Sequence, residues 1–243
     1  MIHKTEGIVL NNTKYSENSV ICNIFTREYG KVGFIINGVR NNKGAIKNSH
    51  IQPLNLVELD MYYNTSKSLQ RIKDLKVTPH LHDLHSNPIK ISISFLMTEL
   101  LSKSIREEEK NEELFEFIRT NVLMTNNSSK NELSNYPSYF ILNLASILGH
   151  NIANDVLHNS SELHNSNNQG IYSSRSLSTI TFNSEEKDRI LSLLSDAYQN
   201  IIGENWSKIE RTLILNKSLD YFQSVVLENS KVKSLSIIRD VMS

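Results

Sequence analysis

The sequence predicts an α+β, multidomain protein: a small N-terminal β-barrel followed by an all-α helical domain. Two observations predict it. Short β-prone runs separated by turn residues occupy residues 1–80, whereas apolar residues recur every three or four positions from Asn87 onward. A chain of 243 residues with 39% hydrophobic content can also supply cores for two modest domains. We therefore predict one domain over residues 1–80 and a second over residues 81–243.

The first domain contains five strand-like runs. Glu28–Lys31 is short enough to join the second and third runs as a hairpin, with Gly30 taking a positive φ. The fifth run also shows helical spacing, at Leu69, Ile72 and Leu75. Five short strands in about 80 residues are typical of the oligonucleotide-binding (OB) barrel. The runs are Ile8–Leu10, Val20–Phe25, Val32–Ile36, Leu54–Tyr62 and Leu69–Val77.

The second domain is predicted to be helical apart from one polar segment. Its first helix follows Asn87, which can cap it, and Pro88, which suits the first helical position. Asn111 precedes two glutamates and begins the second helix. Residues 158–178 are polar and aperiodic, which indicates a loop or insertion. The remaining predicted helices span 137–149, 184–201, 206–227 and 233–242.

The net charge of zero conceals a segregation by region. Residues 1–80 contain eleven Lys and Arg but six Asp and Glu, so this part carries +5 and the rest −5. A basic segment favours an anionic partner, although on charge alone a solvated loop explains it equally well. The densest basic stretch contains one acid, Glu28, and five cations: Arg27, Lys31, Arg40, Lys43 and Lys47.

These five cations are the candidate nucleic-acid-binding residues. Single strands are held by cationic side chains along the phosphates and by aromatic rings on which bases stack. Tyr15 and Tyr29 are the candidate stacking rings, while Phe34 lies in an apolar run and is assigned to the core. Residues 37–49 form a linker rich in Gly and Asn, which would let its three cations follow an irregular strand.

The sequence lacks the local signatures of catalysis. It has no glycine-rich phosphate loop, nucleophile elbow or His-Glu-x-x-His zinc motif, and we predict no enzyme activity. A lower-ranked alternative is a metal-dependent hydrolase using His80, His82 and His85. These histidines lie at the predicted domain junction without a thiolate, so we interpret them as linker residues.

Cysteine content and hydropathy suggest a cytoplasmic location. Cys22 is the single cysteine and lies among apolar residues, which predicts a buried structural thiol and no internal disulfide. No apolar run approaches the roughly 18 residues of a membrane-spanning helix. The first residues include an acid and lack the apolar segment of a secretory signal.

Several stretches, in order along the chain, resemble the RecO family of bacterial recombination mediators. Residues 4–40 and 51–63 resemble its N-terminal barrel, in KTEGIVLNNTKYSENSVICNIFTREYGKVGFIINGVR and IQPLNLVELDMYY. The resemblance continues in the helical part, over residues 87–118 and 232–242, in NPIKISISFLMTELLSKSIREEEKNEELFEFI and VKSLSIIRDVM. The family would place DNA contacts at Arg40, Lys43 and Lys47, after the GxR run, and at Lys31, after the EYG hairpin.

The resemblance implies a DNA repair and recombination protein that is not an enzyme. Such a protein binds single- and double-stranded DNA and anneals complementary strands. With RecR, it promotes loading of RecA onto DNA coated by single-strand-binding protein, whose C-terminal tail it contacts. Many members hold zinc with four cysteines, but this sequence has no cysteine after Cys22, and His158 and His164 alone make a poor site. We therefore expect no metal and no cofactor.

Two further alternatives stay open from the sequence. An OB-fold RNA-binding adaptor would use the same cations and rings. An interaction scaffold would use the basic face to bind acidic protein tails.

Overall fold

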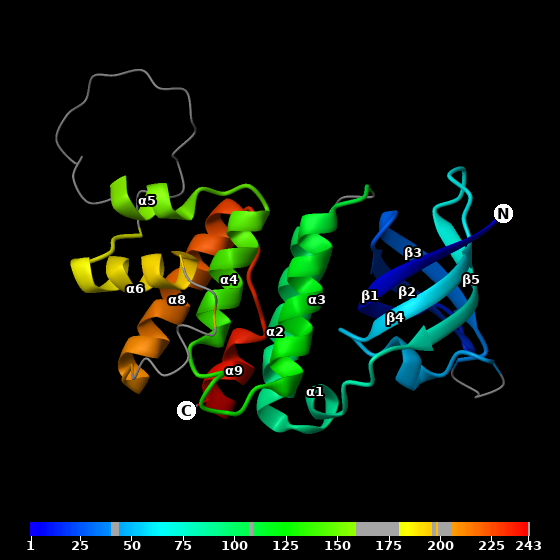
Figure 1. Cartoon of the computed structure of the whole chain (residues 1–243), viewed down its shortest axis with the longest axis horizontal. Helices are drawn as coiled ribbons and strands as arrows, with labels where there is room; N and C mark the ends of the chain where they lie inside the picture. Colours follow the sequence, from blue (N-terminus) through cyan, green and yellow to red (C-terminus); the bar gives the residue numbers. More distant parts are fainter. Residues whose placement is uncertain (40–43, 107–108, 159–179, 196–197, 199–205, 243) are drawn as a thin grey trace, which may run out of the picture. The chain divides into compact units, whose positions relative to one another are not determined.

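The computed structural model describes residues 1–39, 44–106, 109–158, 180–195, 198 and 206–242. It divides into two compact units, residues 1–127 and 128–243, and each is described by itself. Unit 1 contains a closed barrel and three helices, and unit 2 contains helices (Figure 1). The predicted fold class is confirmed. The boundary at residue 80 stays a prediction, because the compact units divide after Asn127 instead.

Five strands close the barrel in the order β1-β2-β3-β5-β4. Neighbouring strands are antiparallel except β3 and β5, which pair in parallel through Gly33 and Phe34 of β3. The fifth run is a strand despite its helical spacing, because it pairs along its length with β4. The strands are β1 (Ile2–Lys14), β2 (Ser19–Thr26), β3 (Gly30–Asn37), β4 (Leu56–Tyr62) and β5 (Leu69–Val77).

Alternate residues of each strand fill the barrel. Val9, Ile24, Phe34 and Met61 have no exposed surface, as expected of small barrels filled by side chains. Cys22 belongs to the same core, and burial raises the pKa of its thiol to about 12. A thiol in that state is protonated at neutral pH, so Cys22 is a structural residue.

Three helices complete unit 1: α1 (His82–Ser86), α2 (Pro88–Ser104) and α3 (Glu112–Asn127). Both predicted caps form. The Asn87 side chain accepts a hydrogen bond of 3.0 Å from the amide of Ile89, and the Asn111 side chain accepts one of 3.0 Å from the amide of Leu114. Each asparagine satisfies an amide that the first helical turn leaves without a partner.

Unit 2 is formed by α4 (Tyr136–Ile147), α5 (Ile152–His158), α6 (Ser184–Ser195), α8 (Lys208–Val225) and α9 (Leu235–Met242). Helix α4 packs against α6 and α8. Helix α5 was not predicted from the sequence, and the hydroxyl of Tyr221 in α8 donates a hydrogen bond of 2.6 Å to its Asp155. Most of the predicted polar loop at 158–178, including His164, lies outside the described residues.

The contacts of Glu210 at the start of α8 should make unit 2 sensitive to acid. Ser207 and Glu210 form a capping box, and Glu210 also pairs with Arg189 of α6. The hydrogen bond from Arg189, with those from Ser207, lowers the pKa of Glu210 from 4.5 to about 2.

A carboxylate whose pKa is lower in the folded than in the unfolded chain stabilises the fold at pH values above its unfolded-state pKa. This stabilisation is lost as the pH falls towards the folded-state pKa. We therefore expect the temperature midpoint of unfolding of unit 2 to decrease as the pH is lowered from 4.5 to 2. In the Glu210→Gln variant this midpoint should decrease less over the same interval. Circular dichroism melts at several pH values measure both proteins. An equal fall in the two would show that this carboxylate does not carry the effect.

Candidate nucleic-acid interface

Arg27 connects the barrel to α3. Its Nε donates a hydrogen bond of 2.6 Å to Glu6 of β1, and its other nitrogens pair with Glu112 and Glu116 of α3. The guanidinium carbon lies 4.5 Å from the centre of the Phe115 ring. The hydrogen bond from Arg27 lowers the pKa of Glu116 below its usual value. With three carboxylates around it, this guanidinium is not open to a phosphate in this arrangement.

Lys31 is also engaged with the helical part of unit 1. Its Nζ donates a hydrogen bond of 2.8 Å to the carbonyl oxygen of Ile105, the C-cap of α2. Nearby, Lys110 pairs with Glu28 at 3.2 Å. The end of the β2–β3 hairpin is therefore docked on the segment between α2 and α3.

The two candidate stacking tyrosines lie in different surroundings. The hydroxyl of Tyr29 is 2.7 Å from Nδ1 of His3, and its ring centre is 4.5 Å from that of Tyr63. Tyr29 is thus half-buried in an aromatic cluster. Tyr15 follows β1 and is 59% exposed. The structure adds Tyr62 at the end of β4, which is 48% exposed.

Only part of the basic loop is described. Arg40 and Lys43 lie outside the described residues, whereas Lys47 is exposed at the start of a short 3-10 helix, η1 (Asn48–Ile51). That helix is fixed to the barrel: Asn12 donates a side-chain hydrogen bond of 2.9 Å to the Ile51 carbonyl, and the Ile51 side chain is fully buried. Lys47 therefore projects from an anchored segment.

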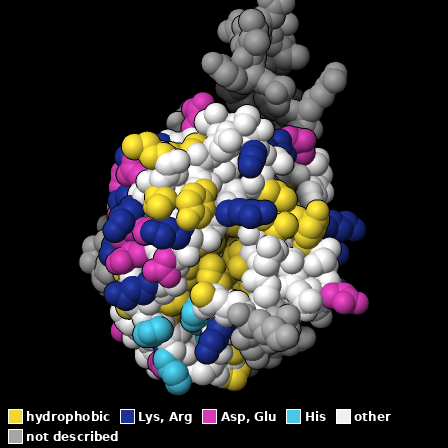
Figure 2. All heavy atoms as spheres, turned by 90° about the vertical axis from the view of Figure 1, so that its right-hand side faces the viewer, with side chains coloured by type: hydrophobic (Ala, Val, Ile, Leu, Met, Phe, Trp, Pro, Cys, Tyr) yellow, Lys and Arg dark blue, Asp and Glu magenta, His cyan; other side chains and the backbone are white. Residues whose placement is uncertain are grey.

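Exposed cations also lie on β1, β5 and the β4–β5 turn, outside the stretch that the sequence singled out. Figure 2 shows a face on which Lys and Arg side chains lie beside a group of hydrophobic side chains. Two of these cations oppose an acid across the sheet, Lys4 opposite Asp60 and Lys76 opposite Glu58. For the cations on strands, the signal that could have found them was their position, because charged residues on a barrel strand point outward. The cations are Lys4, Lys14, Lys67, Arg71, Lys73 and Lys76.

The three junction histidines are not brought together as a metal site. His85 is half-buried, with Nε2 at 2.9 Å from the side-chain oxygen of Asn55, and burial lowers its pKa. His82 lies beside Asp83 instead. Within the described part of the chain, no three His, Cys, Asp or Glu side chains are grouped so that they could hold a metal ion. The geometry thus gives the hydrolase alternative no support.

The length and hydropathy of the helices show whether any of them could cross a membrane. Among the helices that the structure describes, none combines the length and apolar composition needed to cross a bilayer.

Comparison with known proteins gives one consistent result over the barrel and over the whole chain. Residues 1–79 match the family described as "Recombination protein O N terminal". The whole chain is similar to the DNA repair protein RecO of Azobacteroides pseudotrichonymphae, with 28% identity over 241 residues and 99% of each chain covered. It is equally similar to the RecO proteins of Phocaeicola vulgatus, 28% identical with both chains fully covered, and Flavobacterium psychrophilum, 28% identical with 99% of each covered.

Proposed function

This chain belongs to the RecO family of DNA repair proteins, and from that premise we propose that it binds DNA through the outer face of its barrel. Its role lies in DNA repair and recombination, as a mediator rather than as an enzyme. The observation that carries the proposal is the closed five-stranded barrel with exposed cations, in a chain that is similar to RecO proteins from end to end.

The proposed interface consists of the anchored basic loop and the exposed β4–β5 side of the barrel. Lys47 represents the loop among the described residues, and Arg40 and Lys43 join it from the sequence. Because Arg27 and Lys31 are occupied by contacts to the helices, we leave them out of the interface. Phosphate contacts fix position without reading sequence, so we propose binding to both single- and double-stranded DNA.

We further propose the mediator steps that the family implies. The protein would anneal complementary strands and, with RecR, promote RecA loading onto DNA coated by single-strand-binding protein. Contact with the C-terminal tail of that protein would bring it to the coated strand. A DNA partner also places its action in the cytoplasm, at the nucleoid. These steps rest on the family similarity.

Strand annealing tests the proposed function. Two complementary labelled DNA oligonucleotides should pair faster with the protein than without it, because a cationic surface lowers the repulsion between two polyanions. Transfer of fluorescence between the labels measures the rate, and the same strands in RNA provide the comparison. Unchanged annealing together with undetectable DNA binding would contradict the proposal, and exclusive binding of the RNA strands would favour the adaptor alternative.

A further inference from the structure

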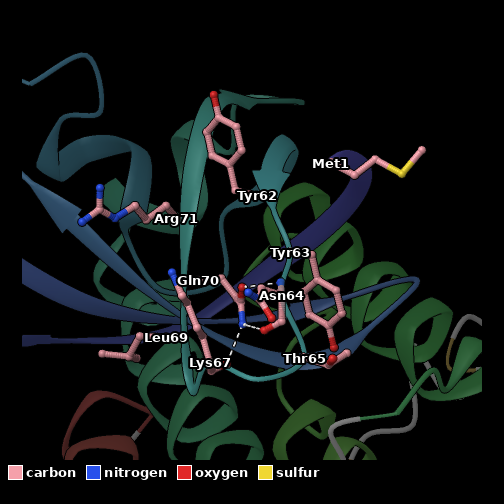
Figure 3. Close-up of a pocket in the computed structure, with 9 residues that line it drawn as sticks. All are labelled: Met1, Tyr62, Tyr63, Asn64, Thr65, Lys67, Leu69, Gln70 and Arg71. Carbon is pink, nitrogen blue, oxygen red and sulfur yellow. Dashed lines mark hydrogen bonds between the residues drawn. The ribbon is translucent and has the colours of Figure 1, made fainter.

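The surface of the barrel is hollowed beside the turn that joins β4 to β5 (Figure 3). The hollow has a volume of about 490 Å³ and is lined mainly by residues between Tyr62 and Arg71. Ligand pockets in proteins span roughly 300–1,000 Å³, so a group the size of one nucleotide fits here. All of the lining belongs to unit 1.

A row of three exposed side chains crosses the strands at this hollow. Ile2 of β1 pairs directly with Tyr62 of β4, and Tyr62 pairs directly with Arg71 of β5. Residues directly opposite one another in antiparallel strands point to the same face. Tyr62 is 48% exposed and Ile2 is 44% exposed, which leaves the tyrosine ring open between an apolar side chain and a cation. Figure 3 shows the Tyr62 ring and the Arg71 guanidinium extending away from the turn.

The turn beneath the row is held by the buried side chain of Gln70. Its Nε2 donates hydrogen bonds to the carbonyl oxygens of Asn64, at 2.9 Å, and Lys67, at 2.7 Å. Its Oε1 accepts a hydrogen bond of 2.9 Å from the Asn64 amide, and Asn64 in turn binds the amide of Ser66. A turn fixed in this way loses little freedom when a ligand arrives, which favours binding.

Charge directs a bound strand along one side of the row. Asp60 and Asp74 face each other across β4 and β5, on the same outer face and farther from the turn, with Lys4 opposite Asp60. Two adjacent carboxylates repel a phosphate. Arg71 and Lys67 offer positive charge at the hollow itself, so the backbone of a bound strand would pass there.

We propose that the hollow takes one unstacked base of a single-stranded nucleic acid, with the base on the Tyr62 ring and its phosphate at Arg71 and Lys67. The inference rests on the proposed function and adds a preference to it. In a duplex the faces of the bases are covered by their neighbours, whereas a single strand can turn a base onto a protein ring. The site therefore favours single strands, although phosphate contacts alone do not.

The test uses the full chain and a single-stranded oligonucleotide that contains 2-aminopurine, a base whose fluorescence responds to stacking. Binding should change this fluorescence, and Tyr62→Leu should abolish the change and weaken single-strand binding by roughly 5-fold or more. Tyr62→Phe keeps the ring and should preserve both. Duplex affinity should be the same for all three proteins. Arg71→Gln should lower the salt slope of single-strand binding by roughly 0.7, the share of one phosphate contact.

The outcomes separate the two proposals. If the protein binds both forms of DNA and Tyr62→Leu behaves like Tyr62→Phe, the base site is wrong while the proposed function stands. If the protein binds no DNA at all, both proposals fail. Because Tyr62 is half exposed, its variants should fold, and their unfolding midpoints confirm this independently.

Discussion

Replacing Arg40, Lys43 and Lys47 together by glutamate is expected to weaken binding of a single-stranded oligonucleotide by roughly 100-fold at 0.1 M salt. Each lost phosphate contact lowers the slope of log affinity against log salt by about 0.7, so three contacts lower it by about 2. Counterion release contributes nothing at 1 M salt. The affinity difference at 0.1 M is therefore close to two powers of ten, and repulsion from the new carboxylates adds to it.

A salt titration followed by fluorescence anisotropy measures both the affinity and the slope. The control is a reversal of Lys130 and Lys208, two exposed lysines of unit 2. It changes the net charge by four, against six in the loop variant and in the same direction, so it shows how large a general effect of charge is. Equal losses in the two variants, or an unchanged slope in the loop variant, would contradict a phosphate-binding loop.

The elements that were predictable from the sequence are those fixed by local chemistry. Short β-prone runs closed by turn residues located the strands, because β-branched and aromatic side chains favour a strand and turn residues end it. Asn87 and Asn111 located two helix starts, because a capping side chain binds amides only two or three residues away. The turn at Gly30 was predictable for the same reason, since its positive φ of 61° is a property of one residue.

The candidate site was less predictable because its contacts are distant in sequence. The sequence predicts Arg27 and Lys31 as nucleic-acid-binding residues, yet Arg27 pairs with Glu112 and Glu116 of α3. Lys31 binds the end of α2. A charge count within residues 27–47 contains no information about carboxylates some 85 residues away. Tyr29 was similarly unpredictable, because its ring is covered by side chains from β1 and from the segment after β4.

Tyr62 is different, because the sequence did contain the information that its side chain points out of the barrel. Leu59 and Met61 face the barrel core, so the alternation of β4 places Glu58, Asp60 and Tyr62 outside. An exposed aromatic residue opposite an arginine on the next strand is then a direct consequence of the register. Only the register of β4 against β5 was missing. It was hard to infer because Asp60 pairs with Asp74 and Met61 pairs with Ile72, which leaves Lys73 of β5 as a one-residue bulge.

The positions of these residues divide the barrel of unit 1 into parts with different tasks. The end of the β2–β3 hairpin holds the helices, through Arg27, Lys31 and the ion pair between Glu28 and Lys110. The β4–β5 turn makes its hydrogen bonds within itself and leaves its outer side chains open. A substitution at the hairpin should thus affect stability first, and one at the turn should affect binding first.

Gly30→Ala is accordingly expected to lower the free energy of unfolding of unit 1 by about 3 kcal/mol. Gly30 has a φ of +61°, which costs alanine roughly 1–2 kcal/mol. A Cβ at this position would also lie 2.3 Å from the carbonyl oxygen and 2.6 Å from the amide nitrogen of Glu109. These are backbone atoms, so either the turn or the segment between α2 and α3 must move, at a cost similar to that of overpacking.

Gly149→Ala provides the matched control, because it isolates the conformational part of this cost. Gly149 has a φ of +94°, and a Cβ there would meet nothing within 4 Å. We expect it to lower the stability of unit 2 by about 1 kcal/mol. Urea unfolding followed by far-UV circular dichroism reports both units, and fluorescence of the single tryptophan, Trp206, reports unit 2. If the two glycine variants lose equal stability, Gly30 does not contact Glu109 in solution. A larger loss at Gly30, with Trp206 unaffected, is the result that docking of the hairpin on the helical segment requires.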